Sequence, residues 1–387
     1  MKTKRLFALF LVLVFISTSN VFANSAPSLN VNAKAAILME PTTGKILLEQ
    51  NAHEKLPLAS VTKVMTMLLI YESVAQGKIA WDDVVTISDH AAGMGGSQVF
   101  LEAMEQQTVR ELTKCIVVSS ANDAAVAMAE FIAGSEEGFV IMMNERAKSL
   151  GMNDTNFLNA CGLDVDGHVS SAYDIALMSK ELINNHPEVY DFTKIWMDTI
   201  VHKTARGNEE FGLSNTNRLI RSYSGATGLK TGSTSEALYC ISATAMRGDM
   251  NLIAVVLGAP DPNTRFHEAM KMLDFGFASY AIIKGDEKGT NVGTIKVIKG
   301  EKQEVPVVVK NQINCLVPKN NTSGLESQIE ILSSLIAPVV SGAKAGEIVY
   351  YFEGTEVGRS DLVALEEIQK ASLGDIISRL LYDWFKY

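Results

Sequence analysis

The chain has 387 residues, 47% of them apolar, which is enough for one large or two moderate domains with a sizeable core. Its net charge of −10 argues against a nucleic-acid partner, because such a protein needs a basic face. Four cysteines in this length do not make a disulfide scaffold, and Cys115 and Cys240 lie in apolar runs, which predicts buried, free thiols. The six histidines are scattered and no metal-binding motif occurs, so we expect no metal and no cofactor.

The N-terminus is typical of a secretory signal peptide. A basic start is followed by the apolar run Leu6–Ile16, which is short for a membrane span, and Val21–Ala23 has small residues at the positions needed for cleavage. We therefore predict a signal peptide at residues 1–23 and an exported protein, with a retained N-terminal anchor as the alternative. Cleavage removes three basic residues and no acidic ones, which makes the exported body more acidic still.

The first half of the chain predicts a hairpin followed by helices. Ala35–Glu40 and Lys45–Glu49 are apolar strands around a Pro-Thr-Thr-Gly turn, and a helical pattern starts at Pro57. Further amphipathic helices are predicted at Val109–Val118, Asn122–Ala133, Glu137–Leu150 and Ala172–Asn184.

After about residue 196 the pattern changes to strands. Tyr239–Ala245 and Asn251–Ala259 flank a turn, and Arg265–Tyr280 reads as a final helix. Strands at both ends with helices between them indicate an α+β fold, in which an antiparallel sheet is flanked by helices, over residues 30–283.

A second domain follows a polar, glycine-containing linker at residues 284–289. Short strands such as Val292–Ile298, Val305–Val309 and Ile348–Phe352 predict a small all-β domain at residues 289–360.

The C-terminal segment, residues 362–387, predicts an amphipathic helix. Its apolar residues step by three and four: Leu373, Ile376, Ile377, Leu380, Leu381, Trp384 and Phe385. We expect this helix to lie in a membrane interface, and the alternative is a helix packed on its own protein.

Three short motifs carry the candidate chemistry: Ser60-Val61-Thr62-Lys63, Ser120-Ala121-Asn122 and Lys230-Thr231-Gly232. Ser60 and Lys63 are three residues apart at a helix start, so both side chains share one face. A serine hydroxyl needs a base to attack a carbonyl, and a lysine serves only when it is neutral. Burial, or a second cation such as Lys230, would lower its pKa enough.

The second motif lies between two predicted helices. Ser120 is placed to relay a proton between Lys63 and a leaving amine, and Asn122 to hold a substrate amide and Lys63. The alternative is that both residues are helix caps.

The third motif lies on a predicted edge strand, where an extended peptide can add as another strand. Lys230 and Thr231 would face the terminal carboxylate of that peptide, and Gly232 would allow close backbone approach. The backbone N–H groups of Ser233 and Ser60 would form an oxyanion hole. The alternative for Lys230 is an ordinary turn lysine.

These motifs resemble those of the penicilloyl serine transferases, and in particular of the low-molecular-mass penicillin-binding proteins that are serine-type D-alanyl-D-alanine carboxypeptidases. The resemblance covers nearly the whole chain. It includes Gly96–Leu101, which is similar to the family's active-site loop, and Gly167–Asp174.

The resemblance implies that Ser60 is the nucleophile, Lys63 the general base and Ser120 a proton carrier. It implies that Asn122, Lys230 and Thr231 bind a peptidoglycan stem peptide ending in D-Ala-D-Ala, from which the terminal D-Ala leaves. Beta-lactams would acylate the nucleophile, and the enzyme would act at the outer face of the cytoplasmic membrane or in the cell wall space.

Some other positions that match the family are expected to have a structural role, and a few positions differ from the family pattern. We expect His168 and Asp174 to be structural. Departures from the family pattern include Thr227, Leu238 and Met104, and none removes a catalytic group.

Other activities share the same three motifs. A DD-endopeptidase remains open, as does a penicillin-binding wall protein with little turnover. A beta-lactamase would need a separate deacylating glutamate, for which the sequence offers no convincing candidate.

Overall fold

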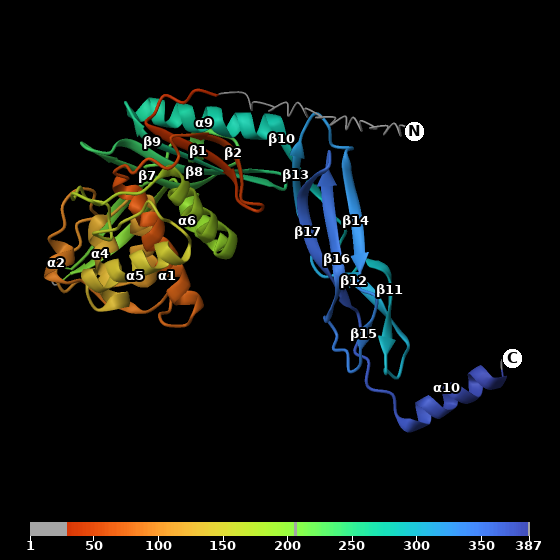
Figure 1. Cartoon of the computed structure of the whole chain (residues 1–387). Coiled ribbons are helices and arrows are strands. Elements are labelled where there is room, and N and C mark those ends of the chain that lie inside the picture. Colours follow the sequence, from red (N-terminus) through yellow and green to blue (C-terminus); the bar gives the residue numbers. More distant parts are fainter. Residues whose placement is uncertain (1–28, 205–206, 386–387) are drawn as a thin grey trace, which may run out of the picture.

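The computed structural model describes residues 29–204 and 207–385, so the predicted signal peptide lies outside the described residues. A helix-rich domain, the body, is joined to an elongated second domain of β-strands. The helix α10 (Leu373–Phe385) lies at the end of the second domain that is far from the body (Figure 1).

The body is built on a five-stranded antiparallel sheet in the order β2-β1-β9-β8-β7. Its strands are β1 (Ala35–Glu40), β2 (Lys45–Gln50), β7 (Ala226–Thr234), β8 (Leu238–Arg247) and β9 (Met250–Ala259). The predicted N-terminal hairpin and the edge position of the Lys230–Gly232 segment are both confirmed.

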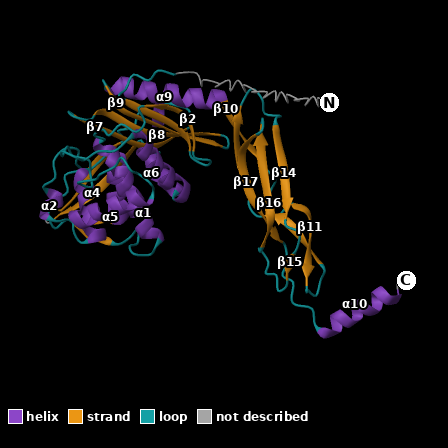
Figure 2. Cartoon of the chain, in the orientation of Figure 1, coloured by secondary structure: helices purple, strands orange, loops and turns teal. Residues whose placement is uncertain are grey.

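Helices occupy both faces of this sheet (Figure 2). They are η1 (Ala59–Thr62, a 3₁₀ turn), α1 (Lys63–Ala75), α2 (Asp89–Ala92), α3 (Val109–Val118), α4 (Asn122–Ala133), α5 (Glu136–Ser149), α6 (Ala172–Asn185), η2 (Pro187–Val189), α7 (Tyr190–Thr193), α8 (Leu219–Ser222) and α9 (Pro262–Ser279).

The inner strand β1 shows why the sheet is covered on both sides. Every residue of β1 is buried, and successive side chains point to opposite faces. Ala35, Ile37 and Met39 join the core that includes α1, α3, α4 and α6, whereas Ala36 and Leu38 join the core beneath α9. A continuous apolar strand is thus explained by helices on both faces.

The predicted helices are largely confirmed, with corrections to where two of them start. The helix expected from Pro57 starts later, as η1 followed by α1, because Ala59 has a left-handed φ of 48° that a regular helix does not accept. The last helix of the body begins at Pro262 rather than Arg265, where the Asp261 carboxylate accepts hydrogen bonds from two backbone N–H groups.

Two small antiparallel sheets of the body, each of two strands, were not predicted. They are β3 (Val84–Thr86) with β4 (Gln106–Thr108), and β5 (Met197–Thr204) with β6 (Gly207–Ser214).

The second domain consists of a six-stranded sheet in the order β14-β16-β17-β12-β11-β15 and a two-stranded sheet, β10 with β13. The strands are β10 (Tyr280–Lys284), β11 (Asn291–Ile298), β12 (Glu304–Val309), β13 (Asn314–Pro318), β14 (Leu325–Ile331), β15 (Leu335–Ile336), β16 (Lys344–Phe352) and β17 (Thr355–Ala364). The predicted linker lies between β10 and β11, but the antiparallel pairing of β10 with β13 ties the two sides of the linker together.

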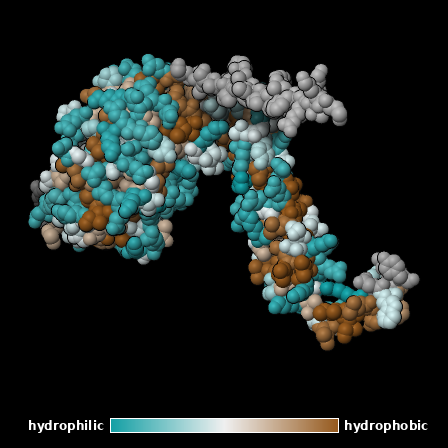
Figure 3. Space-filling view, in the orientation of Figure 1, coloured by the Kyte–Doolittle hydropathy of each residue, from teal (hydrophilic) through white to brown (hydrophobic). Residues whose placement is uncertain are grey.

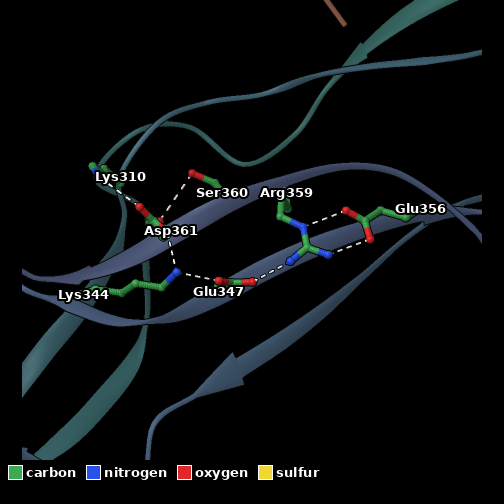
Figure 4. Close-up of polar contacts among 7 residues, drawn as sticks. All are labelled: Lys310, Lys344, Glu347, Glu356, Arg359, Ser360 and Asp361. Atoms are coloured by element: carbon green, nitrogen blue, oxygen red, sulfur yellow. Dashed lines mark hydrogen bonds and ion pairs between the residues drawn. The ribbon is translucent and has the colours of Figure 1, made fainter. Parts of the chain in front are cut away.

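Part of the six-stranded sheet carries a chain of ion pairs across β16 and β17 (Figure 4). Glu347 contacts both Lys344 and Arg359, and Asp361 contacts both Lys344 and Lys310. These groups are partly or fully exposed to solvent, which screens their charges, so each pair contributes little to stability. Their effect is to keep this face polar while the opposite face packs into the domain's core.

The C-terminal helix is shorter than the segment predicted for it. β17 continues through Ala364, and the helix occupies Leu373–Phe385. None of the helices among residues 29–204 and 207–385 has the length and apolar character needed to cross a membrane.

Candidate active site

Ser60 lies in the 3₁₀ turn η1, half-buried between fully buried neighbours. The Thr62 hydroxyl donates a hydrogen bond to the carbonyl of Ala59 at 2.8 Å, which braces the turn. Gly162 packs so closely on this turn that a Cβ there would lie 2.0 Å from the Ala59 oxygen. The position of Ser60 is therefore set from both sides.

His168 stabilises the same turn through a contact with Thr62. Its Nδ1 accepts the backbone N–H of Leu158 at 3.0 Å, so the ring proton is on Nε2, which lies 2.8 Å from the Thr62 hydroxyl. Burial lowers the pKa of His168 to about 4, which keeps the ring neutral. The expectation that His168 is structural agrees with this geometry, and Asp174 likewise accepts hydrogen bonds from Asp154 and Thr155 in a neighbouring loop.

Lys63, the first residue of α1, is fully buried and makes three contacts. Its Nζ lies 3.0 Å from Ser60 Oγ, 2.6 Å from Asn122 Oδ1 and 2.7 Å from the carbonyl of Cys161. Burial lowers the pKa of Lys63 to about 8, against an opposing effect of the nearby Asp123 charge. At pH 7 most of this amine is still protonated, but its neutral fraction is far larger than that of an exposed lysine.

Asn122 begins α4 and holds Lys63 in a defined way. Its Nδ2 donates to the carbonyl of Gly95 at 2.6 Å, which leaves Oδ1 to face Lys63. Its backbone N–H donates to the carbonyl of Ser97 at 2.7 Å. Asn122 thus links the lysine to the loop at residues 95–101.

Asp123 anchors the same loop. Its buried carboxylate accepts hydrogen bonds from the backbone N–H groups of Val99 and Leu101, both at 3.1 Å. Gly96 in this loop has a φ of 80°, and a Cβ there would lie 2.7 Å from Asn122 Nδ2. The close fit explains why a glycine stands at this position.

Ser120 lies between α3 and α4 with an uncommon positive φ of 61°. Its hydroxyl accepts a hydrogen bond from Lys230 Nζ at 2.8 Å. Among the described residues, Lys63 Nζ forms its hydrogen bonds with Ser60, Asn122 and Cys161, whereas Ser120 is bonded to Lys230. The second motif therefore joins the two lysines through different residues, Asn122 to Lys63 and Ser120 to Lys230.

Lys230 lies on β7 and is almost completely buried. Besides Ser120, its Nζ donates to the carbonyl of Thr231 at 2.9 Å. Burial, with the charges of Lys63 and Arg265, lowers the pKa of Lys230 well below its ordinary value. This lysine is not the solvated turn residue considered as an alternative.

The rest of the third motif faces η1. A Cβ on Gly232 would lie 2.8–2.9 Å from backbone atoms of Leu58, Ser60 and Val61, so only glycine lets β7 approach this closely. The Thr231 hydroxyl lies 2.7 Å from that of Thr216. The next residue, Ser233, is exposed at the open side of the strand.

Arg265 belongs to the site but was not predicted to, since the sequence indicates only that a helix starts there. Its guanidinium is buried beneath β7, donates to the carbonyl of Gly232 at 3.1 Å and lies over the rings of Tyr239 and Phe266. Burial lowers the pKa of Arg265 to about 10. No motif marks this residue, because its contact with the site depends on α9 crossing the sheet.

The backbone carbonyls of Gly95 and Cys161 were also missed. Acceptors of this kind carry no sequence signal, since every residue has one.

The structure brings the three motifs into one cluster. Ser60, Lys63, Ser120, Asn122, Lys230, Thr231 and Gly232 are linked by the contacts above, with Ser233 following on the same strand. Within the described part of the chain, no group of three or more His, Cys, Asp or Glu side chains is arranged to hold a metal ion. All four cysteines are free and buried, as predicted for Cys115 and Cys240.

Known families match both parts of the chain. The profile of D-alanyl-D-alanine carboxypeptidases matches residues 20–261, and that of the penicillin-binding protein 5 C-terminal domain matches residues 283–370.

Relatives match over most of their length. The D-alanyl-D-alanine carboxypeptidase DacF of Bacillus subtilis is 43% identical over 356 residues, which cover 92% of this chain and 90% of DacF. DacC of Escherichia coli is 33% identical, covering 96% of this chain and 94% of DacC.

Solved structures agree in fold. Penicillin-binding protein 5 of Haemophilus influenzae superposes with a TM-score of 0.77 at 31% identity, covering 88% of this chain and 99% of that one. On these matches, the chain belongs to the D-alanyl-D-alanine carboxypeptidase family of serine peptidases.

Proposed function

We propose that Ser60 attacks the carbonyl carbon of the penultimate D-Ala in a peptidoglycan stem peptide ending in D-Ala-D-Ala, and that neutral Lys63 is the base. The observation that carries this proposal is the arrangement of Lys63 among Asn122, Cys161 and Ser60.

The contacts of Lys63 orient its lone pair. Asn122 Oδ1 and the carbonyl of Cys161 are oxygens that only accept hydrogen bonds. A neutral amine has two N–H groups, which these two acceptors engage. Lys63 Nζ donates to Ser60 Oγ at 3.0 Å in the structure. Once Lys63 is neutral, its lone pair faces Ser60 instead, and the direction of this hydrogen bond reverses so that the serine hydroxyl donates its proton.

Acylation and hydrolysis follow from this arrangement. The Ser60 oxygen bonds to the carbonyl carbon, the C–N bond to the terminal D-Ala breaks, and the proton taken by Lys63 is returned to the leaving amine. Ser120 carries that proton only after its hydroxyl leaves Lys230, to which it is hydrogen-bonded in the structure, and turns towards Lys63. Water then attacks the ester, which releases the shortened peptide and restores Ser60.

The third motif holds the substrate. The peptide adds along the free edge of β7, with its terminal carboxylate at Lys230 and Thr231. Asn122 binds a substrate amide. The backbone N–H groups of Ser60 and Ser233 stabilise the oxyanion, and the close approach of Gly232 to Ser60 supports this pairing.

A substrate carboxylate also changes the charge balance of the site. An anion beside Lys230 favours its charged form, which opposes the lowering of its pKa by burial and by the neighbouring cations. Lys230 charged by the substrate in turn disfavours a charged Lys63. Binding therefore promotes the neutral base that acylation needs.

The proposal is tested with a fluorescent penicillin and with a pentapeptide ending in D-Ala-D-Ala. We expect labelling of the native chain, no labelling of Ser60→Ala, and release of free D-Ala from the pentapeptide. Labelling that survives Ser60→Ala would contradict the assignment of the nucleophile. Labelling without D-Ala release would indicate a penicillin-binding protein with little turnover, and faster cleavage of a crosslinked dimer would indicate an endopeptidase.

We further propose that residues 1–23 direct export and that α10 associates with the outer face of the cytoplasmic membrane. The apolar residues of α10 are exposed, with Leu373, Leu380 and Trp384 between 65% and 79% accessible, which supports an interfacial helix. Deletion of residues 373–387 is expected to release the protein from membranes, and unchanged partition would contradict the role of α10.

A further inference from the structure

The far end of the second domain exposes apolar side chains of its own. Ile298 on β11 and Ile336 on β15 are 48% and 68% exposed and are register partners in a parallel pairing. Their strand neighbours Val297 and Leu335 face the core instead. Val340 follows close by and is 63% exposed. We call Ile298, Ile336 and Val340 the tip patch.

The helix α10 is fastened to this end and is not a free tether. Lys370 and Gly300 form a β-bridge, and the backbone N–H of Ala371 donates to the carbonyl of Lys299 at 2.9 Å. Arg379, on the helix itself, donates to the carbonyl of Gly300 at 2.7 Å. The helix and the far end of the second domain thus form one unit. Figure 3 shows hydrophobic residues both on α10 and over the lower part of the second domain.

This connection limits how far the tip is from any surface that α10 touches. A helix is about 10–12 Å across, and an interfacial helix lies about 5–10 Å deep in the headgroup region. Arg379 contacts the turn at Gly300 directly. When α10 lies in the interface of a bilayer, this turn is therefore at the level of the lipid headgroups.

The charges near the tip patch suit a lipid headgroup layer. Lys370, one partner of the β-bridge, and Lys299, the residue before the other partner, are both exposed. Glu301 and Glu367 lie in the same turns, so the attraction for anionic lipid is modest and apolar contact supplies most of the binding.

We propose that the tip of the second domain is itself a membrane-contact site, in which the tip patch enters the lipid interface beside α10, and that Arg379 fixes the angle between the helix and the domain. This inference rests on the proposed membrane association of α10.

The test places an environment-sensitive nitrobenzoxadiazole label at single new cysteines, because the four native cysteines are buried. Ile336→Cys reports on the tip patch and Leu380→Cys on α10. Ile329→Cys is the matched control, because Ile329 is 45% exposed but lies on β14, outside the tip patch. With vesicles of phosphatidylcholine and phosphatidylglycerol, we expect blue shifts at positions 336 and 380 and none at 329.

Substitutions add a second readout. Ile298→Ser with Ile336→Ser is expected to weaken vesicle affinity about tenfold through loss of apolar contact, whereas Ile329→Ser leaves it unchanged. In Arg379→Gln, we expect the label at position 380 to keep its blue shift on vesicle binding and the label at position 336 to lose it.

The outcomes separate the two proposals. A shift at 380 without one at 336 overturns the tip site and leaves the role of α10 standing. No shift at either position overturns both. A label at 336 that is already blue-shifted without vesicles shows that the chain covers its own tip patch, which also overturns the inference.

Discussion

Lys63 Nζ and Asn122 Oδ1 lie 2.6 Å apart, and the orientation of the amide is set by its second hydrogen bond, from Nδ2 to the carbonyl of Gly95. A neutral amide beside the buried lysine supplies an acceptor without adding a charge. A carboxylate in the same place would stabilise the protonated amine.

The first prediction follows from this contact. Asn122→Asp is expected to raise the pKa of Lys63 and to slow acylation at pH 7 by about 100-fold or more, with part of the rate recovered at higher pH. The measurement is the pH profile of acylation by a fluorescent penicillin. Asn153→Asp, at an exposed site away from the cluster, is the control, and an unshifted profile in Asn122→Asp would argue against Lys63 as the base.

The native pH profile gives a second prediction. Because burial lowers the pKa of Lys63 to about 8, the acylation rate is expected to rise with pH and to reach half of its maximum near that value. Lys63→Arg keeps a cation that does not lose its proton, so acylation is expected to be lost at every pH tested. Acylation by the arginine variant at a near-native rate would contradict the mechanism.

The third prediction concerns the approach of β7 to η1. Gly232→Ala is expected to reduce acylation by about 100-fold and to cost about 1–3 kcal/mol of unfolding free energy, because the new methyl group would overlap backbone atoms beside Ser60. Gly212→Ala on β6 is a matched control, since no heavy atom lies within 4 Å of a Cβ built there. Penicillin labelling and thermal unfolding measure the two effects.

The fourth prediction concerns His168. Its folded-state pKa, about 4, is below the ordinary value of 6.5, so the unfolded chain binds the proton more readily. The resulting stability is complete above pH 6.5 and is lost as the pH falls toward 4, by at most about 3 kcal/mol.

Thermal unfolding between pH 7 and 4 measures this dependence. His168→Asn is expected to flatten it, whereas His267→Asn, at an exposed position on α9, is expected to leave it unchanged. An unchanged slope in the His168 variant would show that other groups cause the acid sensitivity.

The fifth prediction concerns Arg265. Arg265→Met removes the donor to the Gly232 carbonyl and a cation near Lys230. We expect KM for the pentapeptide to rise about tenfold or more, with a smaller change in kcat and a shifted pH dependence of KM. A variant that only lost stability would leave that pH dependence unaltered.

Elements whose apolar pattern is complete within a short stretch were predictable from the sequence. The helices at Val109–Val118 and Asn122–Ala133 begin and end as predicted. The first has a clear apolar period, and the second is a run of small and apolar residues that is buried without interruption up to Ala129. The hairpin at Met197–Ser214 was missed because most of its side chains are exposed and so carry no such pattern.

The residue types of the site, their order and the division into two domains can be predicted from the order of amino acids, because motifs and apolar periods lie within short stretches of chain. Only in the folded protein does Ser120 bond to Lys230 while Asn122 bonds to Lys63, and only there do Arg265 and two backbone carbonyls complete the cluster. Burial and charge around a group depend on elements far apart in the chain, which short motifs do not specify. The pKa of Lys63 is lowered by the fold that encloses it, and no motif encodes that enclosure.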